Sequence, residues 1–201
     1  MATPMYDLTK RFRPLQKVYE AASYYKLLIK QTYKYYYRDR AKVLSEAFEK
    51  RLGHALDLRN PKTLNEKINW LMLNWRDEFA TVCADKFAVR QVVEERYGAS
   101  ILNTMYGAWD HPEEIDFDQL PEQFILKTNN GCGNHVFCTD KSRLDRKEAI
   151  RTLRQGLRQK YNIYGYEWCY ENIKPKVICE KLLFENGTVP IDYKFFCSIA
   201  W

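Results

Sequence analysis

The sequence predicts an α+β fold, with helices in the first half of the chain and an antiparallel sheet in the second. Before residue 98, apolar residues recur at spacings of three and four, which is typical of amphipathic helices. After residue 100, short apolar runs alternate with Asn- and Gly-rich turns, which is typical of strands joined by hairpins. At 201 residues, with 46% hydrophobic content, the chain can bury a core.

The first expected helix runs from Leu15 to about Arg40. Its apolar positions are Val18, Tyr19, Ala22, Tyr25, Leu28, Ile29, Tyr33 and Tyr36, and its other face carries Lys17, Lys26, Lys30, Lys34 and Arg38. Residues 1–60 contain 13 basic and 6 acidic residues, a net charge of +7. Residues 61–201 contain 19 and 20, a net charge of −1, so the basic character belongs to the N-terminal segment.

This basic, tyrosine-rich helix leaves several interpretations open. It could pack on its own domain with its lysines in solvent, or residues 15–42 could contact an anionic membrane surface or an assembly complex. No nucleic acid is expected as a partner, because the rest of the chain is near neutral and shows no base-reading module.

The cellular compartment is expected to be the cytoplasm, with contact to the inner face of the membrane as the alternative. No run of about 18 uncharged apolar residues occurs, and the N-terminus has no apolar signal core. The six cysteines are dispersed without a C-x-x-C pair, which fits reduced thiols. Cys132, His135 and Cys138 form a C-x-x-H-x-x-C pattern, but no fourth zinc ligand follows at a suitable spacing, and no metal site is predicted.

Two further helices have clear termini in the sequence. One runs from Val43 to Leu52 and ends at Gly53, because glycine readily takes the left-handed conformation of a helix C-terminus. The next begins after Thr63, which forms a capping-box pattern with Glu66. Its expected buried residues are Ile68, Leu71, Met72 and Trp75.

A third helix is expected from about Ala84 to Tyr97, before Gly98. Asp85 and Lys86 are interpreted as its cap and a neighbouring charge, and Arg90 as a surface residue. Further along the chain, a helix is expected over 145–160, and strands over 176–183 and 189–198 with a turn at 185–188 between them.

The hairpin between these elements is the most informative stretch. Strands are expected at Phe124–Thr128 and His135–Thr139, joined by a loop with the sequence Asn129-Asn130-Gly131-Cys132-Gly133-Asn134. Asn and Gly tolerate positive φ and let backbone N–H groups converge around a phosphate. Lys127 lies in an otherwise apolar strand, where a charge needs a partner. A hairpin turn without a ligand is the alternative; the loop is not a Walker A motif.

Several motifs in order resemble the TupA-like ATP-grasp family over roughly residues 58–196, a family met in teichuronopeptide, capsule and other surface-polysaccharide gene clusters. They are Asn60-Pro61-Lys62-Thr63-Leu64-Asn65-Glu66-Lys67, Asp85-Lys86, Val89-Arg90, Leu120-Pro121, Leu126-Lys127, Gly131-Cys132-Gly133, Glu180-Lys181 and Asp192-Tyr193-Lys194. The expected fold is thus N-terminal helices followed by an incomplete ATP-grasp-type antiparallel-sheet nucleotide-binding region. The expected divisions are 1–57, 58–123 and 124–201.

The resemblance implies an ATP-dependent carboxylate–amine ligase that uses ATP and Mg²⁺, with substrates such as a sugar acid and an amino acid. Lys127 would contact the phosphates, and Gly131, Cys132, Gly133 and Asn134 would form a lid. Glu180, Lys181 and Leu183 would line the adenine hinge. Asp192 would face the ribose or phosphates, and Lys194 a phosphate or the acceptor. Simpler alternatives are a Glu180–Lys181 ion pair and a chance shared face for Asp192 and Lys194.

Two departures from the family pattern limit these expectations. Asn130-Gly131-Cys132-Gly133 stands in the lid where the family usually reads His-Gly-Ser-Gly, so a role for that imidazole is lost or passes to His135. The family pattern also continues beyond Phe196 with acidic and Asn-type Mg²⁺ ligands, whereas this chain ends at Trp201. We therefore expect the Mg²⁺ ligands in a missing C-terminal part, and weak or no activity from the 201 residues alone.

Two other functions stay open. The chain could be a non-catalytic scaffold or binding module in a polysaccharide-assembly complex, using its basic helix. It could also be a glycosyltransferase, since Asp116-Phe117-Asp118 matches the Asp-x-Asp pattern of nucleotide-sugar enzymes, although it lies in an acidic loop.

Overall fold

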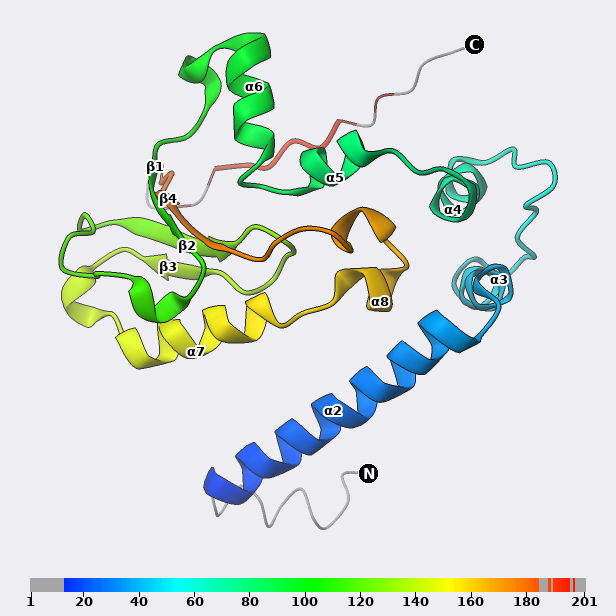
Figure 1. The fold of residues 1–201 in the computed structure, drawn as a ribbon, viewed down its shortest axis with the longest axis horizontal. Helices are drawn as coiled ribbons and strands as arrows, with labels where there is room; N and C mark the ends of the chain where they lie inside the picture. Colours follow the sequence, from blue (N-terminus) through cyan, green and yellow to red (C-terminus); the bar gives the residue numbers. More distant parts are fainter. Residues whose placement is uncertain (1–12, 185–187, 189, 196, 198–201) are drawn as a thin grey trace. The chain divides into compact units, whose positions relative to one another are not determined.

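The computed structural model describes residues 13–184, 188, 190–195 and 197, which fall into two units. The first contains the chain up to Ala80 together with Lys160–Glu171, and the second contains Thr81–Gln159 and the chain from Asn172. Helices occupy the first unit, and an antiparallel four-stranded sheet lies in the second (Figure 1). The expected α+β class is confirmed.

Local sequence signals mark helix termini in the first unit. They are α2 (Arg13–Tyr37), α3 (Arg40–Leu52), α4 (Leu64–Asn74) and α8 (Tyr161–Gly165), with the short 3-10 helix η4 (Trp168–Tyr170). Gly53 ends α3 with a φ of 77°, and its N–H donates to Glu49 O. Thr63 and Glu66 form the expected capping box at the start of α4.

The core of this unit is small and is built from three helices. Val43 and Leu44 of α3 pack with Ile163 of α8 and with Tyr166, and Leu56, Met72 and Leu73 lie against them. Of the residues expected to form the buried stripe of α4, only Met72 packs against this core, so the prediction is wrong for the other three. Ile68, Leu71 and Trp75 are each about 40% exposed, and Trp75 makes an edge-to-face contact with Trp168.

The sheet of the second unit has the strand order β1-β4-β2-β3, and every pair is antiparallel. The strands are β1 (Met105–Trp109), β2 (Phe124–Thr128), β3 (Val136–Cys138) and β4 (Val177–Lys181). The helices of this unit are α6 (Val89–Tyr97) and α7 (Arg146–Leu157), and α5 (Glu78–Ala84) crosses the unit boundary. Short 3-10 turns are η1 (Ala99–Ile101), η2 (Pro112–Glu114) and η3 (Lys141–Arg143).

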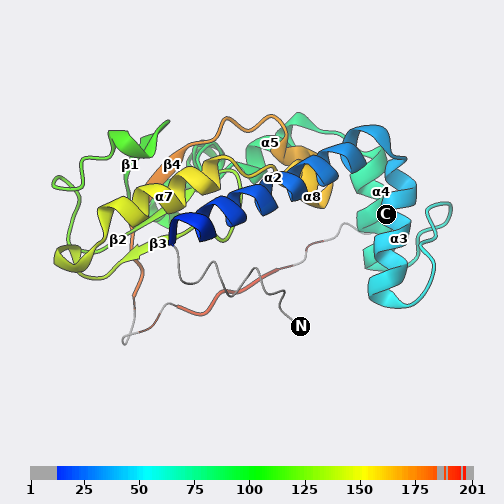
Figure 2. The same cartoon turned by 90° about the horizontal axis from the view of Figure 1, so that it is seen from below.

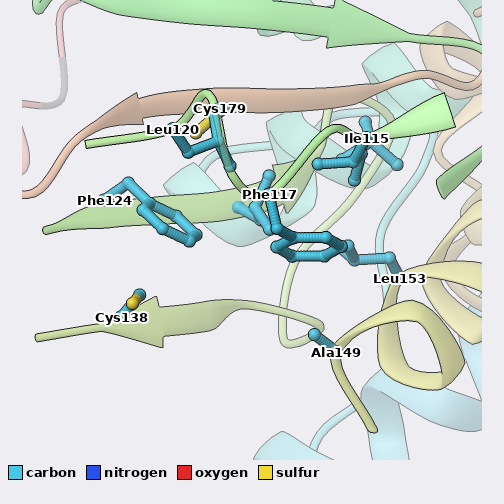
Figure 3. Close-up of a cluster of buried hydrophobic side chains, with 10 residues drawn as sticks. Ile115, Phe117, Leu120, Phe124, Cys138, Ala149, Leu153 and Cys179 are labelled. Carbon is cyan, nitrogen blue, oxygen red and sulfur yellow. The ribbon is translucent and has the colours of Figure 1, made fainter. Parts of the chain in front are cut away.

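The two faces of the sheet differ because side chains alternate along each strand. Phe124 and Leu126 of β2 and Cys179 of β4 are buried on the face that α7 covers, together with Leu153 of α7 (Figure 3). Both cartoon views show α7 running beside β2 and β3 (Figures 1 and 2). The other face presents Ile125 and Lys127, opposite Glu180 and Ile178 in the register.

Two expected elements differ from the structure. The helix expected over 84–97 begins only at Val89, as α6, because Asp85 Oδ1 accepts hydrogen bonds from the backbone N–H groups of Phe87 and Ala88 and stabilises a turn after α5. The strand expected over 189–198 is wrong for its described residues, 190–195 and 197, which have no regular structure. Residues 185–187 of the expected turn, and residues 189, 196 and 198 of the strand, lie outside the described part.

Within the described residues, no helix is both long and apolar enough to cross a bilayer.

The capping box predicts a measurable pH dependence of stability. The backbone N–H groups of Thr63 and Lys62 donate to Glu66 and hold the pKa of that carboxyl at about 2, below its ordinary value of 4.5. Because the pKa is lower in the folded chain, the stabilisation is complete above about pH 5 and is lost as the pH falls from 4.5 towards 2. Denaturant unfolding between pH 6 and 3 should therefore show a shallower acid loss in Glu66→Gln than in the wild type. Parallel pH curves would contradict this assignment.

Candidate functional site

Three cations gather around one carboxylate on the face of the sheet opposite α7, and we call Lys86, Arg90, Lys127 and Glu180 the cation cluster. Lys127 Nζ donates to Glu180 Oε2 at 2.7 Å, and Arg90 Nη1 lies 3.2 Å from Glu180 Oε1. A second Arg90 nitrogen, Nη2, donates to Asn103 O at 2.5 Å. Glu180 is therefore the partner that a lysine in an apolar strand requires.

The cluster is largely withdrawn from solvent. The side chains of Glu180, Arg90 and Lys127 are 9%, 17% and 21% exposed. Antiparallel pairing of Ile125 with Glu180 and of Lys127 with Ile178 makes Lys127 and Glu180 diagonal neighbours, within reach of a long side chain. The turn between α5 and α6 supplies Lys86, and the first turn of α6 supplies Arg90.

Lys86 adds a cation that Glu180 does not neutralise. Its Nζ donates to Gly131 O, and its backbone N–H donates to Asn129 O at 3.2 Å. Burial lowers the pKa of Lys86 below its ordinary value, and the charge of Lys127 lowers it further. The nearby carboxylates of Asp85 and Glu180 act on this pKa in the opposite direction. Three cations thus face two carboxylates, and a bound anion would balance the remaining positive charge.

Asn129 connects the elements that carry these cations. It is fully buried, and its Nδ2 donates to Asp85 Oδ1 at 2.8 Å and to Lys174 O at 3.1 Å. Its Oδ1 accepts from Lys176 N at 2.7 Å. One side chain therefore joins the end of β2, the turn before α6 and the segment before β4, and it uses both amide protons and its oxygen.

The glycine loop lies against the two lysines. Burial lowers the pKa of the His135 imidazole, and the charges of Lys127 and Lys86 lower it further, which shows that His135 lies within electrostatic range of both. Gly133 has a φ of 87°, a conformation that suits glycine. On the other side of the loop, a Cβ at Gly156 of α7 would come within 2.9 Å of the side chains of Asn134 and Thr128. Glycine at 156 permits this close approach.

Asn130, in the same loop, holds a polar atom without a hydrogen-bond partner. The residue is 5% exposed, and its Oδ1 makes no hydrogen bond within the described part of the chain. Such an atom is costly unless something else supplies the bond. Because this oxygen is an acceptor, it would need a donor such as a hydroxyl or an amino group, and it does not itself favour a phosphate.

The structure brings some of the expected site residues together and leaves others apart. Lys127, Glu180 and the loop from Gly131 to Asn134 belong to one region. The alternative Glu180–Lys181 pair is wrong, since Glu180 pairs with Lys127 and Arg90. Lys181 is exposed, and its backbone N–H and C=O bond to Thr104 O and Asn103 Nδ2 at 2.8 and 2.9 Å.

Three other expected residues are open to solvent. Leu183 is 50% exposed, and the side chains of Asp192 and Lys194 are 74% and 72% exposed. Asp192 and Lys194 pair with each other, and no hydrogen bond or ion pair between described residues joins either one to the cation cluster.

Lys86, Arg90 and Asn129 were not expected in the site. Asp85-Lys86 and Arg90 were expected as helix cap and helix surface, because no Gly or Pro marks the turn at 85–88. For Asn129, the available signal was that two Asn residues follow β2, whereas a turn needs only one. The distant segments that its side chain bonds cannot be identified from sequence spacing.

A pocket of about 420 Å³ adjoins the cluster on the side of Arg90. Phe87, Leu102 and Met105 contribute apolar walls, and Arg90, Gln91 and Glu94 contribute polar ones. Met105 is also the register partner of Glu180, so the pocket lies beside the end of β4.

Metal ligation was tested separately. No group of three or more His, Cys, Asp or Glu side chains in the described ranges could hold a metal ion. Cys138 is buried on the α7 side of the sheet, whereas Cys132 is exposed, so the C-x-x-H-x-x-C pattern does not converge. In the Asp-x-Asp pattern, Asp118 pairs with Arg146 at 2.5 Å and its N–H donates to Asp116 Oδ1.

Replacing Asn129 by alanine should destabilise the second unit. The change leaves Lys174 O and Lys176 N without their buried partner and removes one of the hydrogen bonds to Asp85 Oδ1, and we expect a loss of about 3 kcal/mol in the free energy of unfolding. Asn130→Ala is the matched control, and it should cost no more than about 1 kcal/mol because Asn130 Oδ1 has no partner to lose. Denaturant unfolding measures both; equal losses would refute the connecting role of Asn129.

Comparison with known proteins agrees with this geometry. A family model described as TupA-like ATPgrasp matches residues 66–200, which include every member of the cation cluster and the glycine loop. No curated protein and no solved structure gives a match. Because the match covers well over half of the chain, this protein belongs to the TupA-like ATP-grasp family.

Proposed function

We propose that the cation cluster and the glycine loop bind the phosphates of ATP, and that the chain serves an ATP-dependent carboxylate–amine ligase of cell-surface polysaccharide synthesis, of the teichuronopeptide or capsule type. The observation that carries the proposal is the partly buried surplus of positive charge. Lys86 contacts the glycine loop, and Lys127 and Arg90 pair with Glu180 beside it.

A triphosphate would complete this arrangement. Its oxygens accept hydrogen bonds, so Lys127, Lys86 and the N–H groups of Gly131, Cys132, Gly133 and Asn134 are the proposed donors. The electrostatic gain is larger than in water, because the cluster is shielded from solvent. Glu180 keeps Lys127 and Arg90 in place by its ion pairs before the nucleotide arrives.

The base is proposed to lie at the end of β4, where Glu180, Lys181 and Leu183 form the hinge. The apolar walls of the pocket beside Met105 and Arg90 offer a surface for the ring at the same strand end. Asp192 is proposed to face the ribose or phosphates, and Lys194 a phosphate or the acceptor. Because both are exposed and pair only with each other, these two assignments have the least support.

The proposed reaction has two steps. A carboxylate oxygen attacks the γ-phosphorus, the bond to the β-phosphate oxygen breaks, and an acyl phosphate and ADP form. An amine then attacks the acyl carbon, the acyl–oxygen bond breaks, and phosphate leaves as the amide forms. Positioning and charge neutralisation dominate phosphoryl transfer, and Lys86 and Lys127 would supply both for the triphosphate.

Magnesium would add charge neutralisation in such a reaction, but the described residues contain no carboxylate group set that fits it. We therefore assign no step to Mg²⁺ here. The proposed compartment is the cytoplasm, at the inner face of the membrane, and α2 is the element that would make the membrane contact.

A non-catalytic binding module is the second candidate, and the exposed apolar residues of the basic helix α2 favour it. The two candidates differ in a measurable way. The chain of a ligase should bind ATP through Lys86 and Lys127 even where its turnover is weak, whereas a membrane-binding module should bind vesicles without binding ATP.

Removing either lysine should weaken nucleotide binding. We expect Lys127→Ala and Lys86→Ala each to raise the Kd for ATP at least about tenfold, because each loses a shielded charge-assisted bond to phosphate. Isothermal titration calorimetry with the full chain measures this. Lys147→Ala is the control, because Lys147 is an exposed residue of α7, on the opposite face of the sheet.

The outcome that contradicts the proposal is specific. If ATP neither binds nor raises the melting temperature of the wild-type chain, or if both lysine variants bind ATP as the Lys147 control does, the cluster is a structural ion-pair network only. A circular dichroism spectrum of each variant shows whether it is folded.

A further inference from the structure

Helix α2 exposes a row of apolar side chains that its own unit does not cover. Val18, Tyr25, Ile29 and Tyr33 follow the spacing of one helical face, and they are 65%, 56%, 69% and 59% exposed. We call these four residues the α2 stripe. Large apolar side chains in a row on a helix surface mark a binding face, because water solvates them poorly.

A different side of α2 faces its unit, about 100° to 160° around the helix from Ile29. Tyr24, Leu28 and Gln31 are half-buried there, and α2 contacts α8 and α3. Arg38, just after the helix, pairs with Glu46 of α3 at 2.9 Å. The helix is thus attached along one side and presents the stripe on another.

The charge of α2 indicates which kind of partner its stripe would bind. From Arg13 to Tyr37 the helix contains five basic residues and one acidic residue. Lys26, Lys30 and Lys34 are four residues apart and therefore form a row beside the stripe. An anionic surface would attract this row, and tyrosine rings are favoured where apolar and polar layers meet.

A second copy of the chain fits this surface less well. Pairing two stripes would bring the rows of Lys26, Lys30 and Lys34 near one another, and Glu20 is the only acidic residue in each helix to compensate. The helix is also not apolar enough to cross a bilayer. Its pattern of one apolar row flanked by lysines is that of a helix lying in the interface plane.

We propose that α2 lies on an anionic lipid bilayer, with the stripe in the headgroup–acyl boundary and Lys26, Lys30 and Lys34 on acidic headgroups. This inference rests on the first unit alone and does not depend on nucleotide binding in the second. It would hold the chain at the membrane by reversible contact.

The test is flotation of the full 201-residue chain with two kinds of vesicle, phosphatidylcholine alone and phosphatidylcholine mixed with phosphatidylglycerol. We expect binding to the mixed vesicles, weak binding to phosphatidylcholine, and loss of binding at about 0.5 M NaCl. Hydrogen exchange should show protection by the mixed vesicles within 18–37.

One variant in the stripe and one control variant elsewhere on α2 test whether the stripe itself binds the bilayer. Ile29→Asn should weaken binding roughly 30-fold, because it removes a side chain buried in the bilayer. Leu27→Asn is the control: Leu27 is also exposed, at 48%, but lies about 200° around the helix from Ile29, and its loss should change binding within about twofold.

Charge is tested with two triple variants. Lys26→Gln/Lys30→Gln/Lys34→Gln should weaken binding to the mixed vesicles roughly 100-fold. The control Arg143→Gln/Lys147→Gln/Arg158→Gln removes three exposed cations from the second unit and should bind within about fivefold of wild type. If circular dichroism shows that Ile29→Asn has lost helical structure, the two triple variants still test the proposal.

Three results would overturn the proposal. They are no binding of the wild-type chain to mixed vesicles, equal losses in Ile29→Asn and Leu27→Asn, and a dimer in sedimentation equilibrium that Ile29→Asn abolishes without vesicle binding. The dimer would assign the stripe to a second copy. ATP titration of the same variants separates the two proposals, since ATP should bind to all of them whether or not the helix contacts lipid.

Discussion

The carboxylate of Glu180 holds two cations in a shielded place, and the arrangement of the second unit depends on it. Lys127 of β2 and Arg90 of α6 both pair with this carboxylate. Glu180 of β4 therefore joins a neighbouring strand to a helix that lies far earlier in the chain. Buried ions cost solvation free energy and persist only where paired. Glu180 satisfies two cations, and Lys86 remains in excess beside the glycine loop. The same ion pairs that join these elements therefore leave positive charge beside the glycine loop, where we propose that an anion binds.

Asn129 gives this site its geometry. A flexible loop alone would place its N–H groups over many positions, and ordering it on binding would reduce affinity. Asn129 bonds to Asp85, Lys174 and Lys176. These bonds fix the start of the loop relative to the cation cluster. Gly156 then lets the far side of the loop approach α7. A stable core on one face of the sheet thus supports a preorganised polar site on the other.

Local sequence predicted the local structure well. Thr63 with Glu66, Gly53, and the Phe124–Thr128 strand are confirmed because each depends on neighbouring residues. The wrong predictions are those in which contacts between residues far apart in the sequence determine the structure. Asp85 breaks a helical pattern by bonding to its own following N–H groups and to Asn129, and Glu180 meets partners 53 and 90 positions away. Family resemblance indicated Lys127 and the glycines, but only the fold shows Lys86 and Arg90 beside them.

The central claim is that Lys86 and Lys127 lie at the phosphates of bound ATP. An acyl-phosphate derivative of ATP tests it directly, because it transfers its acyl group to amines next to the phosphate chain, and peptide mass spectrometry locates the label. The account predicts labelling at Lys86 or Lys127 that excess ATP prevents. Labelling confined to other lysines, or labelling at these two that ATP does not reduce, would contradict it.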